Sequence, residues 1–143
     1  MLICFNDLNR NAARAHLKEL IAISADVSPW GADELLYELP QKWLLSFTAH
    51  TDELIGYCIL SNKFPRRTHI HQFMVRADMR GKNVGRAMLC EAIARTEQKR
   101  SLSLKVHKGN INAQRFYLNN GFGLDIEDGD YLWMLYKGNK VLG

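Results

Sequence analysis

Residues 80–86 read Arg80-Gly81-Lys82-Asn83-Val84-Gly85-Arg86 and stand between an expected strand and an expected helix. The first N–H groups of a helix have no partner inside the helix, and the helix dipole adds positive potential there. A diphosphate can accept hydrogen bonds from these N–H groups, and its negative charge is stabilised by the positive potential. The two glycines let its oxygen atoms approach the backbone. The stretch lacks the Gly-Lys-Ser/Thr ending of a P-loop and is not G-x-G-x-x-G. It therefore predicts an anion-binding loop of another kind.

The segments around this loop predict alternating strands and helices. Apolar patterning predicts strands at residues 2–5, 43–50, 54–61, 69–75, 102–106, 123–127 and 131–137. It predicts helices at residues 12–25, 32–39, 84–98 and 112–119. Trp43 and Trp133 are expected in strands of the core. This order predicts one α/β domain over residues 1–143, with a mixed sheet.

Charge and composition narrow the class of protein. The formal net charge is +4, and the basic residues concentrate between positions 66 and 108. This favours a local anion site over nucleic-acid binding, because no aromatic residues interleave with the basic cluster. No apolar stretch approaches the roughly 20 residues of a membrane span, and nothing directs export, so a cytoplasmic protein is expected. Cys4, Cys58 and Cys90 show no C-x-x-C spacing, so we expect buried free thiols and no metal.

A second stretch identifies the family. Residues 110–122 read NINAQRFYLNNGF and are similar to the N-x-x-A-x-x-x-Y-x-x-x-G-F pattern of the GNAT N-acetyltransferase superfamily. Residues 80–85 resemble the family's Q/R-x-x-G-x-G/A signature, with Arg80 first, Gly85 last and Asn83 in place of the first glycine. The two half-motifs follow in the family's order, at about its spacing.

The resemblance implies a fold and a co-substrate, acetyl-CoA. The fold is a single GNAT domain: a mixed, mostly antiparallel sheet of six to seven strands flanked by about four helices, with the fourth and fifth strands splayed. Asn tolerates left-handed backbone better than other non-glycine residues, so we expect Asn83 to preserve binding. The cofactor site implied by the resemblance comprises the main chain of Phe73, Met74 and Val75 for the pantetheine, the loop Arg80, Gly81, Lys82, Asn83, Val84, Gly85 and Arg86 for the diphosphate, and Asn110, Ala113 and Tyr117.

Acetyl transfer to an amine needs a proton acceptor for the amine and a proton donor for the leaving thiolate. Tyr117 matches the family position of the donor, and a phenol is protonated at pH 7. His71 falls where many family members have a carboxylate, and His69 shares its face of the strand. A histidine is well matched to taking a proton near neutral pH. A structural role for these histidines, or a base acting through water at Glu34, Glu38 or Glu53, remains an alternative.

The acceptor is expected to be a primary amine of a small molecule or of a peptide N-terminus. Ser28-Pro29-Trp30 resembles a segment of the RimI-like enzymes, which acetylate ribosomal-protein N-termini. Lys105 opposes this resemblance, because it stands where those enzymes carry a catalytic glutamate. Trp30, His69 and Lys105 are the expected acceptor-binding residues.

Two further expectations come from the same comparison. A non-catalytic acyl-CoA-binding regulatory module is the alternative function, since Lys105 replaces the expected carboxylate. The family resemblance also suggests a homodimer formed through the closing hairpin.

Overall fold

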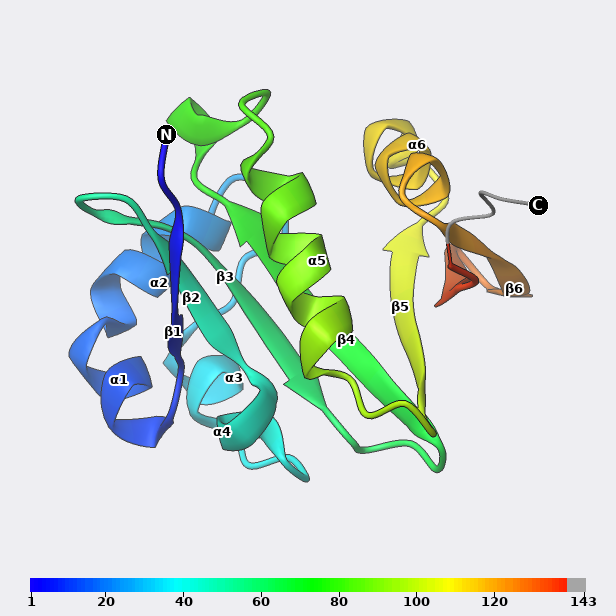
Figure 1. Ribbon diagram of the computed structural model, residues 1–143, viewed down its shortest axis with the longest axis horizontal. Coiled ribbons are helices and arrows are strands. Elements are labelled where there is room, and N and C mark those ends of the chain that lie inside the picture. The colour runs from blue at the N-terminus through cyan, green and yellow to red at the C-terminus, as the bar shows by residue number, and fades with distance from the viewer. Residues whose placement is uncertain (139–143) are drawn as a thin grey trace.

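A computed structural model describes residues 1–138, and residues 139–143 of the predicted domain lie outside the described residues. Figure 1 shows the strands and helices. The strands are β1 (Cys4–Asp7), β2 (Phe47–His50), β3 (Leu54–Ser61), β4 (Arg67–Val75), β5 (Ser101–His107), β6 (Phe122–Asp128) and β7 (Tyr131–Tyr136). The helices are α1 (Arg10–Ala15), α2 (Leu17–Ser24), α3 (Ala32–Leu36), α4 (Lys42–Leu45), α5 (Val84–Arg95) and α6 (Ile111–Asn119), with a 3₁₀ turn at Ala77–Met79.

The strands form one sheet in the order β1-β2-β3-β4-β5-β7-β6. Neighbouring strands are antiparallel except β4 and β5, which are parallel. These two pair only from Arg67–Ile70 to Ser101–Leu104, and beyond that register they diverge (Figure 1). The mixed, mostly antiparallel sheet with splayed fourth and fifth strands is therefore confirmed.

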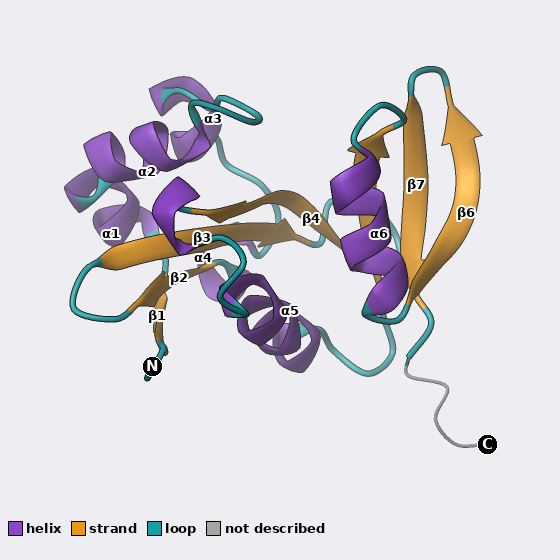
Figure 2. Cartoon of the chain, turned by 90° about the horizontal axis from the view of Figure 1, so that it is seen from above, coloured by secondary structure: helices purple, strands orange, loops and turns teal. Residues whose placement is uncertain are grey.

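Helices cover both faces of the first half of the sheet, as the apolar strand patterns require. Figure 2 shows α1, α2 and α3 on one face and α5 on the other, with α6 against the β5-β7-β6 end. One buried cluster lies between the sheet and the N-terminal helices and includes Leu20, Leu35 and Tyr57. The other lies under α5 and α6 and includes Met88 and Tyr117. The sheet thus separates two cores.

Helix α5 lies close to β3 because Gly56 has no side chain. A Cβ at Gly56 would lie 2.7 Å from the carbonyl oxygen of Met74 and 2.8 Å from the sulfur of Met88. Both separations are too short for real contacts. The glycine therefore lets β3, β4 and α5 approach closely, and this sets the height of the α5 N-terminus above the sheet.

Three N-terminal predictions need correction. The expected helix at 12–25 is two helices, which break at His16, and the helix expected at 32–39 ends at Leu36. The expected strand at 43–50 is a strand only from Phe47, because Lys42–Leu45 form α4, so Trp43 lies in a helix. The three apolar residues at 43–45 are too few to distinguish helix from strand by periodicity. The described chain consequently has six α-helices rather than about four.

The prediction that the cysteines are buried is correct for only one of them. Cys58 on β3 is fully buried, whereas Cys4 and Cys90 are exposed. Cys90 lies on the solvent side of α5, one residue after the buried Leu89. An apolar segment therefore did not specify which of its faces is covered.

Lys42 is a fully buried lysine that holds α3 in place. Its Nζ donates hydrogen bonds to the carbonyl oxygens of Tyr37 (2.7 Å), Leu35 (2.8 Å) and Glu34 (3.3 Å). These carbonyls lie at the C-terminal end of α3, where helical partners are lacking. Burial lowers the pKa of Lys42 to about 8, so the ammonium still carries its three donors at pH 7.

We expect Lys42→Met to lower the free energy of unfolding by about 2–4 kcal/mol, because it leaves buried carbonyl groups without partners. Urea denaturation at pH 7 measures this loss. Lys18→Met is the matched control: Lys18 is exposed on α2, so its replacement should change stability by less than about 0.5 kcal/mol. Equal effects of the two substitutions would show that Lys42 does not hold α3.

Candidate active site

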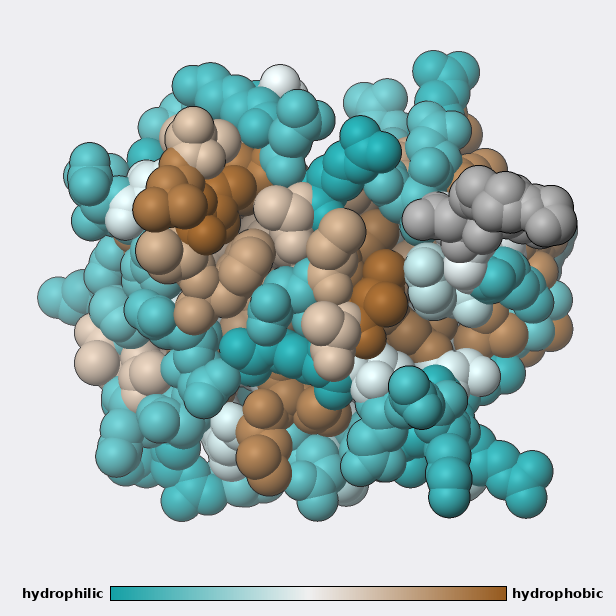
Figure 3. Space-filling view, viewed as in Figure 1, coloured by the Kyte–Doolittle hydropathy of each residue, from teal (hydrophilic) through white to brown (hydrophobic). Residues whose placement is uncertain are grey.

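The divergence of β4 and β5 opens a cleft of about 650 Å³. In the space-filling view, apolar residues gather in the hollow between the part of the molecule that carries α5 and the part that carries α6 (Figure 3). Its walls come from β4, the loop before α5, the start of α5, the helix α6 and the loop between α2 and α3. The lining residues are Val27, Phe73, Met74, Val75, Arg80, Gly81, Asn83, Gly85, Arg86, Asn112, Ala113, Phe116, Tyr117, Asn119 and Asn120.

The cleft brings together all but three of the residues predicted to bind the cofactor. Val84 is buried in the core below the loop, and Lys82 is exposed outside the lining set. Asn110 instead begins α6, where its Oδ1 accepts a hydrogen bond from the Ala113 N–H at 3.1 Å. Its side chain therefore fixes α6 rather than lining the cleft.

The N-terminus of α5 faces the cleft without a side-chain cap. Asn83 stands at the cap position with a left-handed backbone, φ 66°, and its side chain makes no capping hydrogen bond. Gly81 is also left-handed, at φ 76°. These turns direct the first amides of a twelve-residue helix toward the cavity. Asn83 therefore adopts the left-handed conformation that a glycine would take, and its compatibility with cofactor binding stays a prediction.

Gly85 sets the width of the cleft between α5 and α6. A Cβ at this position would lie 3.3 Å from the ring of Phe116 and 3.9 Å from that of Phe73. Any larger side chain would project between the two helices. The absence of a side chain at Gly85 therefore keeps the space between the two helices open, in addition to giving access to the backbone.

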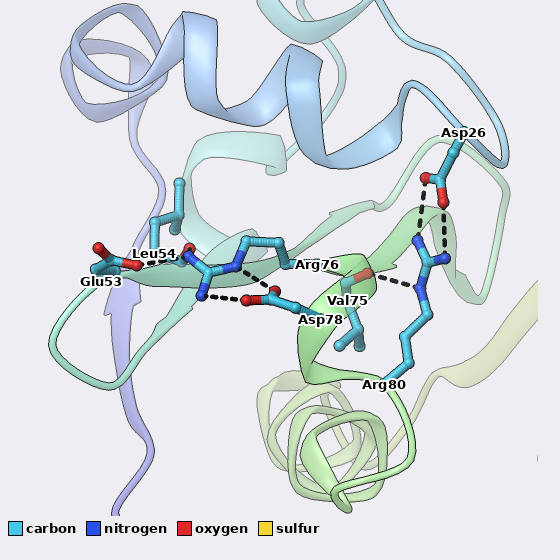
Figure 4. Close-up of polar contacts among 7 residues, drawn as sticks. All are labelled: Asp26, Glu53, Leu54, Val75, Arg76, Asp78 and Arg80. Atoms are coloured by element: carbon cyan, nitrogen blue, oxygen red, sulfur yellow. Dashed lines mark hydrogen bonds and ion pairs between the residues drawn. The ribbon is translucent and has the colours of Figure 1, made fainter.

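Arg80 is engaged in an ion pair that the sequence did not predict. Its Nη1 and Nη2 donate to the two carboxylate oxygens of Asp26 at 2.8 and 3.1 Å, and its Nε donates to the Val75 carbonyl at 3.0 Å (Figure 4). Hydrogen bonding to Arg80 lowers the pKa of Asp26. The charge of Arg80 is thus already paired with a carboxylate 54 residues away in the sequence.

Tyr117 lies on α6 at the bottom of the cleft. Its side chain is 9% exposed, and its ring contacts those of Phe73, Phe116 and Phe122. Burial raises the pKa of the Tyr117 phenol. Within residues 1–138 its hydroxyl has no hydrogen-bond partner, although it lines the cleft. A protonated hydroxyl group is therefore available to a ligand.

His69 and His71 share one face of β4, as predicted, with ring centroids 4.8 Å apart. A bulge between β3 and β4 places His71 outside the regular register. His71 Nε2 lies 2.6 Å from Ser61 Oγ, which also accepts the Lys63 N–H. Burial lowers the pKa of His71 to about 4 and that of His69 to about 3. Both rings are therefore neutral at pH 7.

A second, smaller cavity of about 290 Å³ lies beside α3, lined by Trp30, Asp33, Glu34, Tyr37, Leu39, Lys63 and His71. Among the expected acceptor residues, only Trp30 lines it. His69 is buried between His71 and Trp133. Lys105 lies on β5 with its Nζ 4.7 Å from the centre of the Tyr131 ring. Its charge therefore faces the β5–β7 side rather than this cavity.

The sequence analysis missed several residues of the two sites. Val27 and Asp26 come from the α2–α3 loop, and no local motif marks them. Asn112, Phe116, Asn119 and Asn120 lie on or directly after α6 and enter the cleft beside the predicted anchors. Phe116 and Asn120 follow Ala113 and Tyr117 by three residues, a helical spacing that could have found these two.

Comparison with known proteins defines the class. Residues 5–122 match the model of the acetyltransferase (GNAT) family. No curated protein matches the chain in sequence. The fold and cleft are those of an acyltransferase domain, and the match over most of the chain shows that this protein belongs to the acetyltransferase (GNAT) family. The predicted class of enzyme, an acetyl-CoA-dependent N-acyltransferase, is thereby confirmed.

Solved structures of low sequence identity share the fold. The ribosomal-protein-S18-alanine N-acetyltransferase of Escherichia coli is 17% identical, with a TM-score of 0.77 over 99% of both chains. The PaiA N-acetyltransferase of Thermoplasma acidophilum, solved in complex with coenzyme A, is 19% identical, with a TM-score of 0.72 over 96% of this chain and 100% of that one. Ard1 of Thermoplasma volcanium is 19% identical, with a TM-score of 0.75 over 94% and 96%.

Among residues 1–138, no helix is both long and apolar enough to cross a membrane. The same part of the chain contains no group of three or more His, Cys, Asp or Glu side chains placed to hold a metal ion.

The buried neutral histidines predict a pH dependence of stability. Below about pH 6.5 the unfolded chain takes up a proton that folded His71 resists until about pH 4. The free energy of unfolding should therefore fall as the pH drops through this window. In His71→Gln, urea denaturation between pH 5 and 6.5 should give a slope shallower by up to about 1.4 kcal/mol per pH unit.

His107→Gln is the control for this measurement, because the His107 side chain is exposed. Its removal should leave the slope as in the wild type. An unchanged slope in His71→Gln would contradict a neutral, buried His71.

Proposed function

We propose that this protein transfers the acetyl group of acetyl-CoA to a primary amine of a small molecule or of a peptide N-terminus, with Tyr117 as the general acid. The observation that carries the proposal is the uncapped N-terminus of α5, which opens into the same cleft as the Tyr117 hydroxyl. The first feature fits a diphosphate and the second fits a leaving thiolate. The cytoplasmic location expected from the sequence belongs to this proposal.

The residues of the cleft fit the diphosphate and the pantetheine of acetyl-CoA. The amides at the start of α5 provide donors for the diphosphate, and Arg86 adds positive charge at the cleft. Beyond Ile70, β4 has no β5 partner, so main-chain groups of Phe73 to Val75, apart from the Val75 carbonyl that accepts from Arg80, are available to amides of the pantetheine. The rings of Phe73 and Phe116 provide an apolar wall.

Acetyl-CoA supplies a thioester carbonyl that a neutral amine can attack, with a thiolate as the leaving group. Tyr117 keeps its proton throughout the physiological range, because its pKa is raised. Its unpartnered hydroxyl can donate a hydrogen bond to the sulfur as negative charge develops there. The buried ring contacts hold the hydroxyl in one place.

His71 is the proposed proton acceptor for the amine. It lines the second cavity, and its ring is neutral at pH 7. The Lys63 N–H donates to Ser61 Oγ, and in the tautomer in which His71 Nε2–H donates to the same oxygen, the Nδ1 lone pair is free to accept the amine proton. With a pKa of about 4, His71 holds the amine proton only briefly and releases it to solvent. Homodimer formation through the β6–β7 hairpin remains a prediction.

The activity is tested by release of CoA thiol from acetyl-CoA in the presence of polyamines, aminoglycosides, amino acids and peptide N-termini. We expect at least one class to be acetylated. If CoA binds but no amine in the panel releases thiol, the chain is an acyl-CoA-binding module and the proposed activity is wrong.

When assayed with an amine that the panel identifies as an acceptor, Tyr117→Phe should lower kcat by about 100-fold or more, since a general acid contributes roughly 10²–10⁴-fold to the rate. The dissociation constant for CoA should stay within about threefold, because the ring remains. Tyr136→Phe is the control: Tyr136 contacts Phe122 from β7 and does not line the cleft. A Tyr117→Phe enzyme with wild-type kcat at every pH would exclude the acid role.

Gly85→Leu should weaken CoA binding by at least about tenfold, or about 1.4 kcal/mol, because the new side chain projects toward Phe116 across the cleft. Isothermal titration calorimetry with CoA measures this. Ala94→Leu, at an exposed site later in α5, should bind CoA as the wild type does. Unchanged affinity in a folded Gly85→Leu protein would place CoA elsewhere.

A further inference from the structure

The loop between α2 and α3, residues 25–31, forms part of both cavities. Val27 lines the large cleft, and Trp30 lines the smaller cavity beside α3. The two side chains are only three residues apart. A shift of this loop would therefore change the walls of the large cleft and of the smaller cavity together.

Three contacts anchor this loop. Trp30 N–H donates to Ser24 Oγ at 3.1 Å, and Gln72 Nε2 donates to the Ser28 carbonyl at 2.9 Å. These two anchors join the loop to α2 and to β4. The third is the pair between Asp26 and Arg80, which joins it to the loop preceding α5.

The Asp26–Arg80 contact has a fixed geometry. Both carboxylate oxygens of Asp26 accept from the guanidinium, while Arg80 Nε holds the carbonyl of Val75 at the open edge of β4 (Figure 4). A bidentate Arg–carboxylate pair constrains orientation as well as distance. Arg80 therefore connects three parts of the site: the end of β4, the anion-binding loop and the α2–α3 loop.

The same contact contributes little to the stability of the fold. The side chains of Arg80 and Asp26 are 39% and 51% exposed, and ion pairs between exposed side chains contribute little to the free energy of unfolding. Removing the pair should leave the protein folded. Its effect is then confined to the position of the loop.

We propose that Asp26 and Arg80 are positioning residues, through which binding of CoA in the cleft sets the place of Trp30 in the acceptor cavity. This inference rests on the proposed function of the cleft. A diphosphate at the start of α5 lies beside the anion-binding loop and displaces it together with Arg80. Asp26 follows through its two hydrogen bonds, and the loop that carries Trp30 moves with it. Coupling of this kind is reciprocal, so an acceptor held by Trp30 would change the affinity for CoA by the same factor.

The test follows the indole N–H resonance of Trp30 in ¹⁵N-labelled protein during titration with CoA. The Trp30→Phe spectrum distinguishes it from the resonances of the two other tryptophans. We expect CoA to shift the wild-type resonance, and Asp26→Asn to reduce the shift at saturation by at least about half while CoA still binds. Asp26→Glu, which restores the charge, should recover it.

Asp78→Asn is the matched control. Asp78 forms the equivalent exposed bidentate pair with Arg76, at 2.6 and 3.1 Å, in the adjacent segment (Figure 4). Its loss should leave the Trp30 shift unchanged.

The outcomes separate this inference from the proposed function. If CoA binds the wild type without shifting the Trp30 resonance, the positioning role is wrong and the proposed function stands. The same holds if CoA shifts the Trp30 resonance in Asp26→Asn as far as in the wild type. An equal reduction of the CoA-induced Trp30 shift in Asp78→Asn would also overturn the positioning role, because the effect would not be specific to the Asp26–Arg80 pair. Failure of CoA to bind the wild type would overturn both.

Discussion

The short pairing between β4 and β5 is the constraint on which the site depends. The two strands share only four residues of parallel register before they diverge. An unpaired strand edge inside a protein must find hydrogen-bond partners, and here the edge faces a cleft rather than another strand. Because α5 begins and α6 lies at this opening, helix-terminal amides, free strand groups and the Tyr117 hydroxyl face one space.

The two sides of β4 have different electrostatic environments. The cleft side carries the amides of α5 and the basic Arg86, which suits an anionic co-substrate. The other side holds His69 and His71 as neutral rings, because burial disfavours their charged forms. The bulge in β4 places the His71 side chain on this other side, away from the basic cleft, as the proposed role of His71 in proton transfer requires.

Strong periodicity explains which elements could be predicted. Helix α5 and the strands β3, β5, β6 and β7 were expected within a few residues of their bounds, since each has a local apolar pattern or is bounded by turn residues. The N-terminal region was less predictable. His16 interrupts a continuous helical pattern, and α4 forms where Lys42 reaches back to the end of α3. Such interruptions follow from tertiary contacts, which a local pattern does not contain.

The sequence by itself determined the anion-binding loop, the left-handed position at Asn83 and the anchors of α6, because each depends on backbone conformation or spacing within one short segment. Only the tertiary structure decided the partner of Arg80, the low pKa values of the two histidines, the burial of Lys42 and the place of Lys105 beside Tyr131. These properties arise from residues that are distant in the chain and from the exclusion of water. Charge and burial at this site are therefore consequences of the fold rather than of the motif.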